Sequence, residues 1–84
     1  MKTIQELGAA LALRRKEMGL KQRTVALRAG LSPESLSRFE RGHSAEFGAR
    51  KLLSVLAVLG LELQFDQVGF SGSLDELRRE RAKS

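Results

Sequence analysis

The fold of this chain is decided by residues 19–42, which read GLKQRTVALRAGLSPESLSRFERG. A run of helical periodicity that starts at Lys21 ends at Gly30 after barely two turns, because glycine readily adopts the left-handed conformation that stops a helix. Ser32 and Pro33 then form the usual start of a second helix, with serine as the N-cap and proline as the first helical residue. Two helices joined by so short a turn must cross steeply. The stretch therefore predicts a helical pair whose second member stands out from the body of the domain.

The flanking sequence predicts one further helix on each side of this pair. Thr3 and Glu6 form a capping box, which opens a helix of about residues 4–18. A strongly apolar helix of about residues 48–59 follows the pair and should form the backbone of the core. The apolar positions at helical spacing, which we expect to face the core, are Ile4, Leu7, Leu11, Met18, Val25, Ala26, Leu36, Phe39, Leu52, Leu53, Val55, Leu56 and Leu59.

Beyond Gly60 the apolar pattern changes from helical spacing to alternation. Leu61, Leu63 and Phe65 alternate with polar residues, which is typical of a half-buried β-strand. A single strand would leave its backbone donors and acceptors unpaired, so we expect it to pair with the same strand of a second chain in a symmetric dimer. The alternative is an irregular tail that lies on the core.

This division predicts one domain over residues 1–66 and a flexible tail over residues 67–84. Another capping box, Ser73 and Glu76, allows a short terminal helix within the tail. An isolated helix of that length is marginal in water. We therefore expect the tail to be disordered in the free protein and to order on a partner.

Composition excludes several classes of function. The 84 residues include no cysteine and one histidine, so neither a disulfide framework nor a thiolate or imidazole-cluster metal site is available. The sequence has no cluster of catalytic side chains, no phosphate-binding glycine loop and no metal-ligand spacing, so we expect no enzyme, no metal and no cofactor. No apolar run reaches the roughly 20 residues of a membrane span, and no apolar leader follows Met1. We expect a soluble, cytoplasmic protein.

Positive charge is concentrated in the first two thirds of the chain. Residues 1–59 carry eleven Lys and Arg against five Asp and Glu, whereas residues 60–84 carry four against five. A basic face of this kind favours nucleic acid or an acidic protein surface as the partner. The chain has no Trp or Tyr, and its four Phe do not alternate with basic residues, so the stacking platforms used on single strands and RNA are missing. Duplex DNA is the better candidate.

The stretch of residues 19–42 quoted above resembles the Xre/Cro family of helix-turn-helix repressors, the lambda-repressor-like proteins. The leucine-rich helix and the strand that follow it resemble HipB-type antitoxins, whose strand pairs across the dimer. The resemblance covers about residues 4–66, and it implies a mainly α, lambda-repressor-like DNA-binding domain of four to five helices with one C-terminal β-strand that pairs across a homodimer. The residues that carry it are Gln22 at the start of the first motif helix, Ala26 at the helix crossing, Gly30 at the turn, Leu31 and Leu36 in the core, and the closing Glu40, Arg41 and Gly42.

In such a fold the second helix of the motif enters the major groove. Arg38 can bond guanine through two nitrogens, and Glu34 can accept a hydrogen bond from a cytosine amino group. Glu34 could instead serve only as an acid that stabilises the helix dipole. The outward positions expected to specify the DNA sequence are Pro33, Glu34, Ser35, Ser37 and Arg38.

The start of the first motif helix predicts a phosphate contact. Lys21 and Arg23 place positive charge where it opposes the helix dipole, an effect that a bound phosphate would reverse. Gln22 can add a side-chain donor. The full set of expected DNA-binding residues is Lys21, Gln22, Arg23, Ser32, Pro33, Glu34, Ser35, Ser37, Arg38 and Arg41. Further candidates for phosphate contacts, some of them simply solvated, are Arg14, Lys16, Arg28, Arg50 and Lys51.

Three residues near the motif are expected to have no direct role in DNA recognition. Arg15 and Glu40 match an ion pair that, in the family, ties the first helix to the end of the recognition helix. If they pair, losing one partner would leave a partly buried charge uncompensated. His43, in the loop that follows, is expected to be a bystander or a backbone contact rather than a switch.

The resemblance implies a homodimeric repressor that binds an inverted-repeat operator and is the antitoxin of a HipBA-like toxin-antitoxin system, with a HipA-like kinase toxin as its partner. The two recognition helices of such a dimer read half-sites one helical turn apart. One alternative is a stand-alone regulator of the same family without a toxin partner. Another is a protein-interaction module whose basic face binds an acidic partner and never touches DNA.

Overall fold

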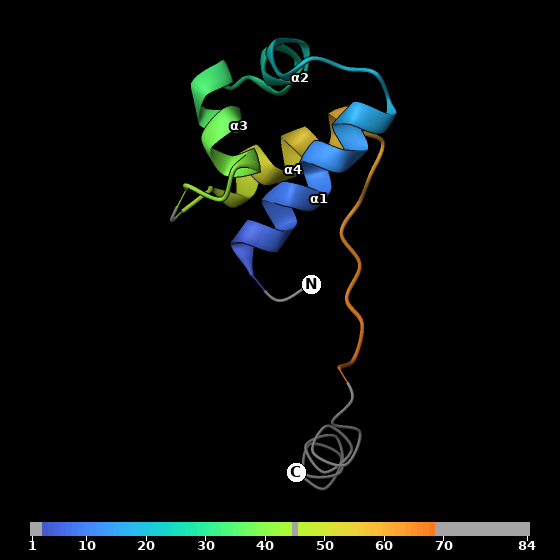
Figure 1. Ribbon diagram of the computed structural model, residues 1–84. Helices are drawn as coiled ribbons and strands as arrows, with labels where there is room; N and C mark the ends of the chain where they lie inside the picture. Colours follow the sequence, from blue (N-terminus) through green and yellow to red (C-terminus); the bar gives the residue numbers. More distant parts are fainter. Residues whose placement is uncertain (1–2, 45, 69–84) are drawn as a thin grey trace, which may run out of the picture.

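The computed structural model describes residues 3–44 and 46–68 of the chain. All regular secondary structure in those ranges is helical, which confirms the mainly α prediction, and each helix lies within a residue or two of its predicted bounds (Figure 1). The helices are α1 (Ile4–Glu17), α2 (Gln22–Ala29), α3 (Pro33–Glu40) and α4 (Ala49–Val58).

The helix ends follow the local signals of the sequence. The Thr3 hydroxyl accepts a hydrogen bond from the Glu6 backbone N–H at 3.0 Å and so caps α1. The Ser32 hydroxyl caps α3 in the same way. Between the two motif helices, Gly30 adopts a φ of 76°, a left-handed conformation that favours glycine. These caps place the turn between α2 and α3 where the sequence predicts it.

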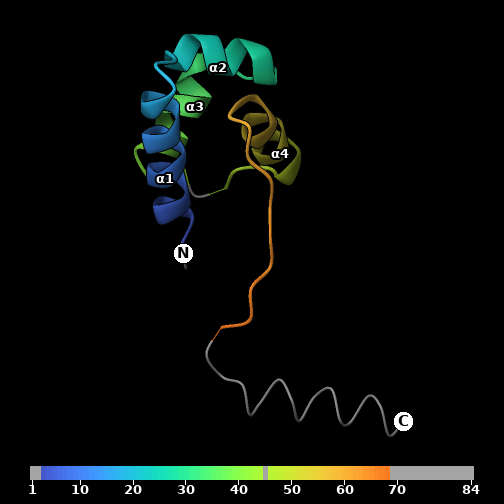
Figure 2. The same ribbon diagram turned by 90° about the vertical axis from the view of Figure 1, so that its right-hand side faces the viewer.

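The four helices enclose one small core. Figure 2 shows α1 and α4 on either side of the domain, with α2 lying across one end. The Phe39 ring stacks on the Phe47 ring, with centroids 4.0 Å apart, which fastens the end of α3 to the segment that leads into α4. The buried apolar residues are Leu11, Val25, Ala26, Leu36, Phe39, Val55, Leu56 and Leu59, all of them predicted core positions.

Two predicted core positions are wrong. Met18 is 40% exposed, because α1 ends one residue earlier and Met18 lies at its C-cap, past the apolar stripe. Leu53 is 52% exposed, since it falls on the outer face of α4 together with Ala49 and Ala57, which are also exposed. Helical periodicity therefore predicted that α4 is apolar, but it did not predict which of its apolar residues face the core and which face solvent.

Gly8 permits the close approach of α1 to α3. A Cβ atom built on Gly8 would lie 2.1 Å from the backbone carbonyl oxygen of Phe39, which is far inside van der Waals contact. Only glycine fits at this crossing without moving the helices apart. The helical periodicity of residues 4–18 does not predict this contact.

The segment that follows α4 runs away from the four helices (Figure 1). Within the part of the chain that the structure describes, residues 61–68 form no hydrogen-bonded strand, and Leu61, Leu63 and Phe65 are 37%, 48% and 95% exposed. In the single chain these residues neither form the predicted half-buried strand nor lie on the core as in the alternative. The pairing of two strands across a dimer stays a prediction. The predicted tail helix lies outside the described residues.

Candidate nucleic-acid interface

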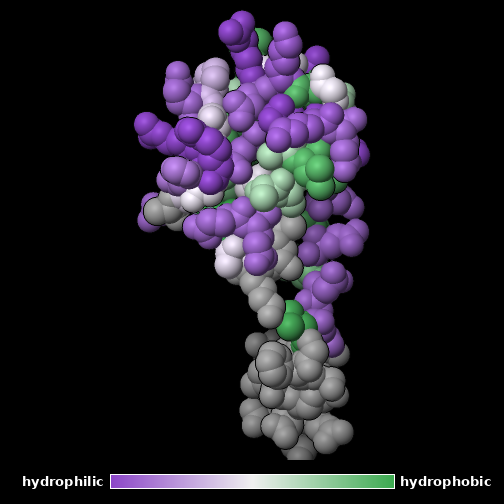
Figure 3. All heavy atoms as spheres, in the orientation of Figure 1, coloured by the Kyte–Doolittle hydropathy of each residue, from purple (hydrophilic) through white to green (hydrophobic). Residues whose placement is uncertain are grey.

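The outward face of α3 is set by two buried anchors. Leu36 and Phe39 are fully or almost fully buried, which turns the opposite side of the helix toward solvent. Pro33, Glu34 and Arg38 are exposed on that side, and the predicted positions Ser35 and Ser37 are half-buried. Figure 3 shows that hydrophilic residues gather over the end of the molecule that carries α2 and α3.

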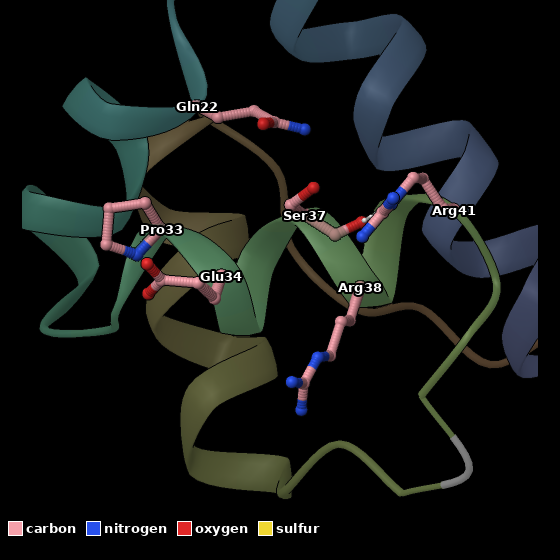
Figure 4. Close-up of a pocket in the computed structure, with 6 residues that line it drawn as sticks. All are labelled: Gln22, Pro33, Glu34, Ser37, Arg38 and Arg41. Atoms are coloured by element: carbon pink, nitrogen blue, oxygen red, sulfur yellow. Dashed lines mark hydrogen bonds between the residues drawn. The ribbon is translucent and has the colours of Figure 1, made fainter.

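Six of the ten predicted DNA-binding residues line one open hollow of about 360 Å³ beside α3. Gln22 enters it from the start of α2, and the other residues come from α3 and its C-cap (Figure 4). The Arg41 side chain is braced there, since its Nε donates to the Ser37 carbonyl oxygen at 3.3 Å. The six lining residues are Gln22, Pro33, Glu34, Ser37, Arg38 and Arg41.

The other four predicted residues lie at the starts of the two motif helices. Lys21 is the N-cap of α2 and makes no side-chain capping bond, and Arg23, two residues further on, is exposed. The first turn of α2 holds no acidic residue and no side-chain cap, so two cations, Lys21 and Arg23, lie beside a helix start whose N–H groups have no such partner. In α3 the Ser32 hydroxyl accepts from the Ser35 N–H at 3.1 Å, which gives Ser32 a capping role.

A buried hydrogen-bond network fixes α3 to the other motif helix and to α1. Arg15 forms a two-pronged ion pair with Glu40, with Nε to Oε2 at 2.8 Å and Nη2 to Oε1 at 2.9 Å, as predicted. Its third nitrogen, Nη1, donates to the Leu20 carbonyl oxygen at 2.8 Å. The Gln22 Nε2 atom donates to Glu40 Oε1 at 2.8 Å, a contact that the sequence analysis did not predict. Gln22 therefore has a structural role, and its second amide hydrogen and its oxygen are left for a ligand.

Of the further phosphate candidates, Arg14 has a structural role. Its Nε donates to the carbonyl oxygen of Leu59, the C-cap of α4, at 3.0 Å, so Arg14 ties α1 to the end of α4. The Arg14 guanidinium thus makes a contact within the fold. The other candidates are exposed, as is His43, whose backbone N–H donates to the Arg38 carbonyl oxygen at 2.9 Å.

The arrangement suits an anionic ligand. In the described ranges, no group of three or more acidic, cysteine or histidine side chains could hold a metal ion. Within the same residues, no helix is both long enough and apolar enough to cross a membrane. What the surface offers is a protruding helix with polar and basic side chains beside an uncapped helix start.

Residues 11–65 match the helix-turn-helix family model. The chain belongs to this helix-turn-helix family. This assignment confirms the predicted family of DNA-binding regulators, and the matched range includes the two predicted motif helices, α2 and α3.

One similar solved structure is that of the clp gene regulator ClgR from Corynebacterium glutamicum, which is 37% identical and superposes with a TM-score of 0.67. The match covers 70% of this chain and 62% of that chain, so this protein spans less than two thirds of the ClgR chain. Comparison with curated proteins gave no match. The lambda-repressor-like fold is thus confirmed, and the likeness to HipB-type antitoxins stays a prediction.

The ion pair between Arg15 and Glu40 is expected to fix the orientation of α3 more than it adds to the net free energy of unfolding. Replacing Glu40 by Ala should lower the free energy of unfolding by about 3–5 kcal/mol, because the Arg15 guanidinium would stay buried without its partner. The double variant Arg15→Met, Glu40→Leu should recover most of that loss, since no charge is then left buried. Urea denaturation followed by circular dichroism measures both. A double variant as unstable as Glu40→Ala would contradict this account.

Proposed function

We propose that this protein is a sequence-specific transcriptional repressor that binds an inverted-repeat DNA operator as a homodimer. The observation that carries the proposal is the outward face of α3, held by the buried Arg15 and Glu40 pair, with Arg38 exposed and next to the start of α2. Membership of the helix-turn-helix family and the likeness to a gene regulator support it. On this proposal α3 reads base edges, and the start of α2 binds a phosphate of the DNA backbone.

The dimer follows from the sequence of residues 61–65. Leu61, Leu63 and Phe65 are exposed in the single chain, and exposed apolar residues at alternate positions suit a strand that pairs with its copy. Pairing would bury these side chains and place two α3 helices about 34 Å apart, one turn of DNA.

The finer proposal is that the repressor is also an antitoxin for a HipA-like kinase toxin. It rests on the resemblance of the final helix and strand to HipB-type antitoxins. The stand-alone regulator is the alternative, and the likeness to the clp gene regulator ClgR favours it. Co-purification of this chain with the kinase-like product of a neighbouring gene is the expected result for an antitoxin, and its absence would favour the stand-alone regulator.

Arg38→Ala should weaken binding to the promoter upstream of the gene by about 1–3 kcal/mol, with little effect on random duplex, because a bidentate contact with guanine carries sequence information. A salt-titrated binding assay on both duplexes measures the difference. Arg28→Ala removes the same charge from the far end of α2, outside the hollow, and should affect the two duplexes equally. Equal and weak binding of the native chain to every duplex would instead point to the basic face as a surface for an acidic protein.

Leu63→Pro should convert the dimer into a monomer and weaken operator binding, since proline lacks the N–H that strand pairing requires and bends the segment. Sedimentation velocity measures the oligomeric state. The control variant Gln67→Pro introduces a proline beyond the predicted strand and should leave the dimer intact. A Leu63→Pro variant that stays dimeric would rule out strand pairing as the interface.

A further inference from the structure

Among the described residues that line the hollow beside α3, Glu34 is the one acidic side chain. It is exposed on the first turn of α3 and lines the hollow with Arg38 and Arg41. Among residues 3–44 and 46–68, no hydrogen bond or ion pair engages its carboxylate. Figure 4 shows Glu34 and Arg38 extending outward from successive turns of α3, with no bond drawn between them.

The start of α3 is capped without Glu34. The Ser32 hydroxyl accepts from the Ser35 N–H, and the Ser32 carbonyl oxygen accepts from the Leu36 N–H at 3.3 Å. Pro33, the first helical residue, has no N–H to satisfy. Glu34 makes no capping bond, so attraction to the helix dipole is the only structural role that the fold leaves to it.

A carboxylate in the major groove can bind few of the groups that DNA presents there. It accepts hydrogen bonds and donates none, and phosphates repel it. Guanine and thymine present acceptors in the major groove, whereas cytosine presents only its N4 amino group. Adenine offers the N6 amino group beside the N7 acceptor, a pair that suits an amide and not a carboxylate. Cytosine is therefore the base that fits Glu34.

Arg38 fixes where that cytosine lies. Residues four apart on a helix have Cβ atoms about 5–6 Å apart, while successive bases of a strand rise by about 3.4 Å. The guanine that suits Arg38 and the cytosine that suits Glu34 thus fall within about two base-pair steps of each other.

We propose that Glu34 reads the cytosine of a base pair that lies within about two base pairs of the one whose guanine Arg38 reads. This inference rests on the proposed DNA-binding function and narrows it to operators that hold such a cytosine and guanine in each half-site. Glu34 is then a specificity-determining residue, and the acid excludes half-sites that present guanine or thymine at that position.

The test is selection of bound sequences from a random duplex library by the full chain and by Glu34→Gln. Glutamine can bond adenine N6 and N7 together. The native chain is expected to enrich cytosine at one position of each half-site. Glu34→Gln should prefer adenine there by at least about fivefold, and both proteins should keep the neighbouring guanine.

Glu17→Gln is the matched control, because it removes the same charge from an exposed residue at the end of α1 and should select the native sequence. Continued selection of cytosine by Glu34→Gln, with the guanine retained, would overturn the inference and leave DNA binding in place. Enrichment of no sequence by any of the three proteins would overturn both the inference and the proposed function.

Discussion

The carboxylate of Glu40 is the point on which the orientation of α3 depends. It accepts two hydrogen bonds from Arg15 of α1 and one from Gln22 of α2, and the side chains of the ion pair are only 10% and 5% exposed. With water largely excluded, these bonds have few competitors, and a change in the angle of α3 would leave a buried charge unpaired. The outward face of α3 therefore owes its orientation to this network.

The same network accounts for a conflict at the start of α2. Lys21 and Arg23 oppose the helix dipole, and no side chain caps this helix. The helix forms nonetheless, because the Gln22 side chain donates a hydrogen bond to the Glu40 carboxylate, and Val25 and Ala26 are fully buried in the core. Tertiary contacts thus stabilise α2 in place of the missing cap, and the N–H groups of its first turn stay without a side-chain acceptor. A phosphate site at a helix start requires both a stable helix and free N–H groups.

Sequence reasoning succeeded where the signal was local. The left-handed Gly30 and the capping Ser32 depend on neighbours within a few residues, so the motif and its outward face could be predicted. Gly8 was missed because its constraint is the Phe39 carbonyl oxygen, 31 residues away, although a glycine inside a predicted helix was a usable signal. The Arg14 contact with Leu59 spans 45 residues and had no sequence signature.

That last contact bears on how two copies would be held. Arg14 donates to the Leu59 carbonyl oxygen, a favourable position for a cation at a helix C-terminus, and the Leu61 N–H donates to the Leu56 carbonyl oxygen at 2.8 Å across the left-handed Gly60. The chain therefore leaves α4 in a fixed direction. In a dimer paired through residues 61–65, a flexible connection after α4 would let the distance between the two α3 helices vary. Only a fraction of those dimers would fit an operator of fixed length. In such a dimer a rigid exit at α4 would remove that loss, and the contacts that end this helix would then serve the proposed DNA recognition as much as those that orient α3.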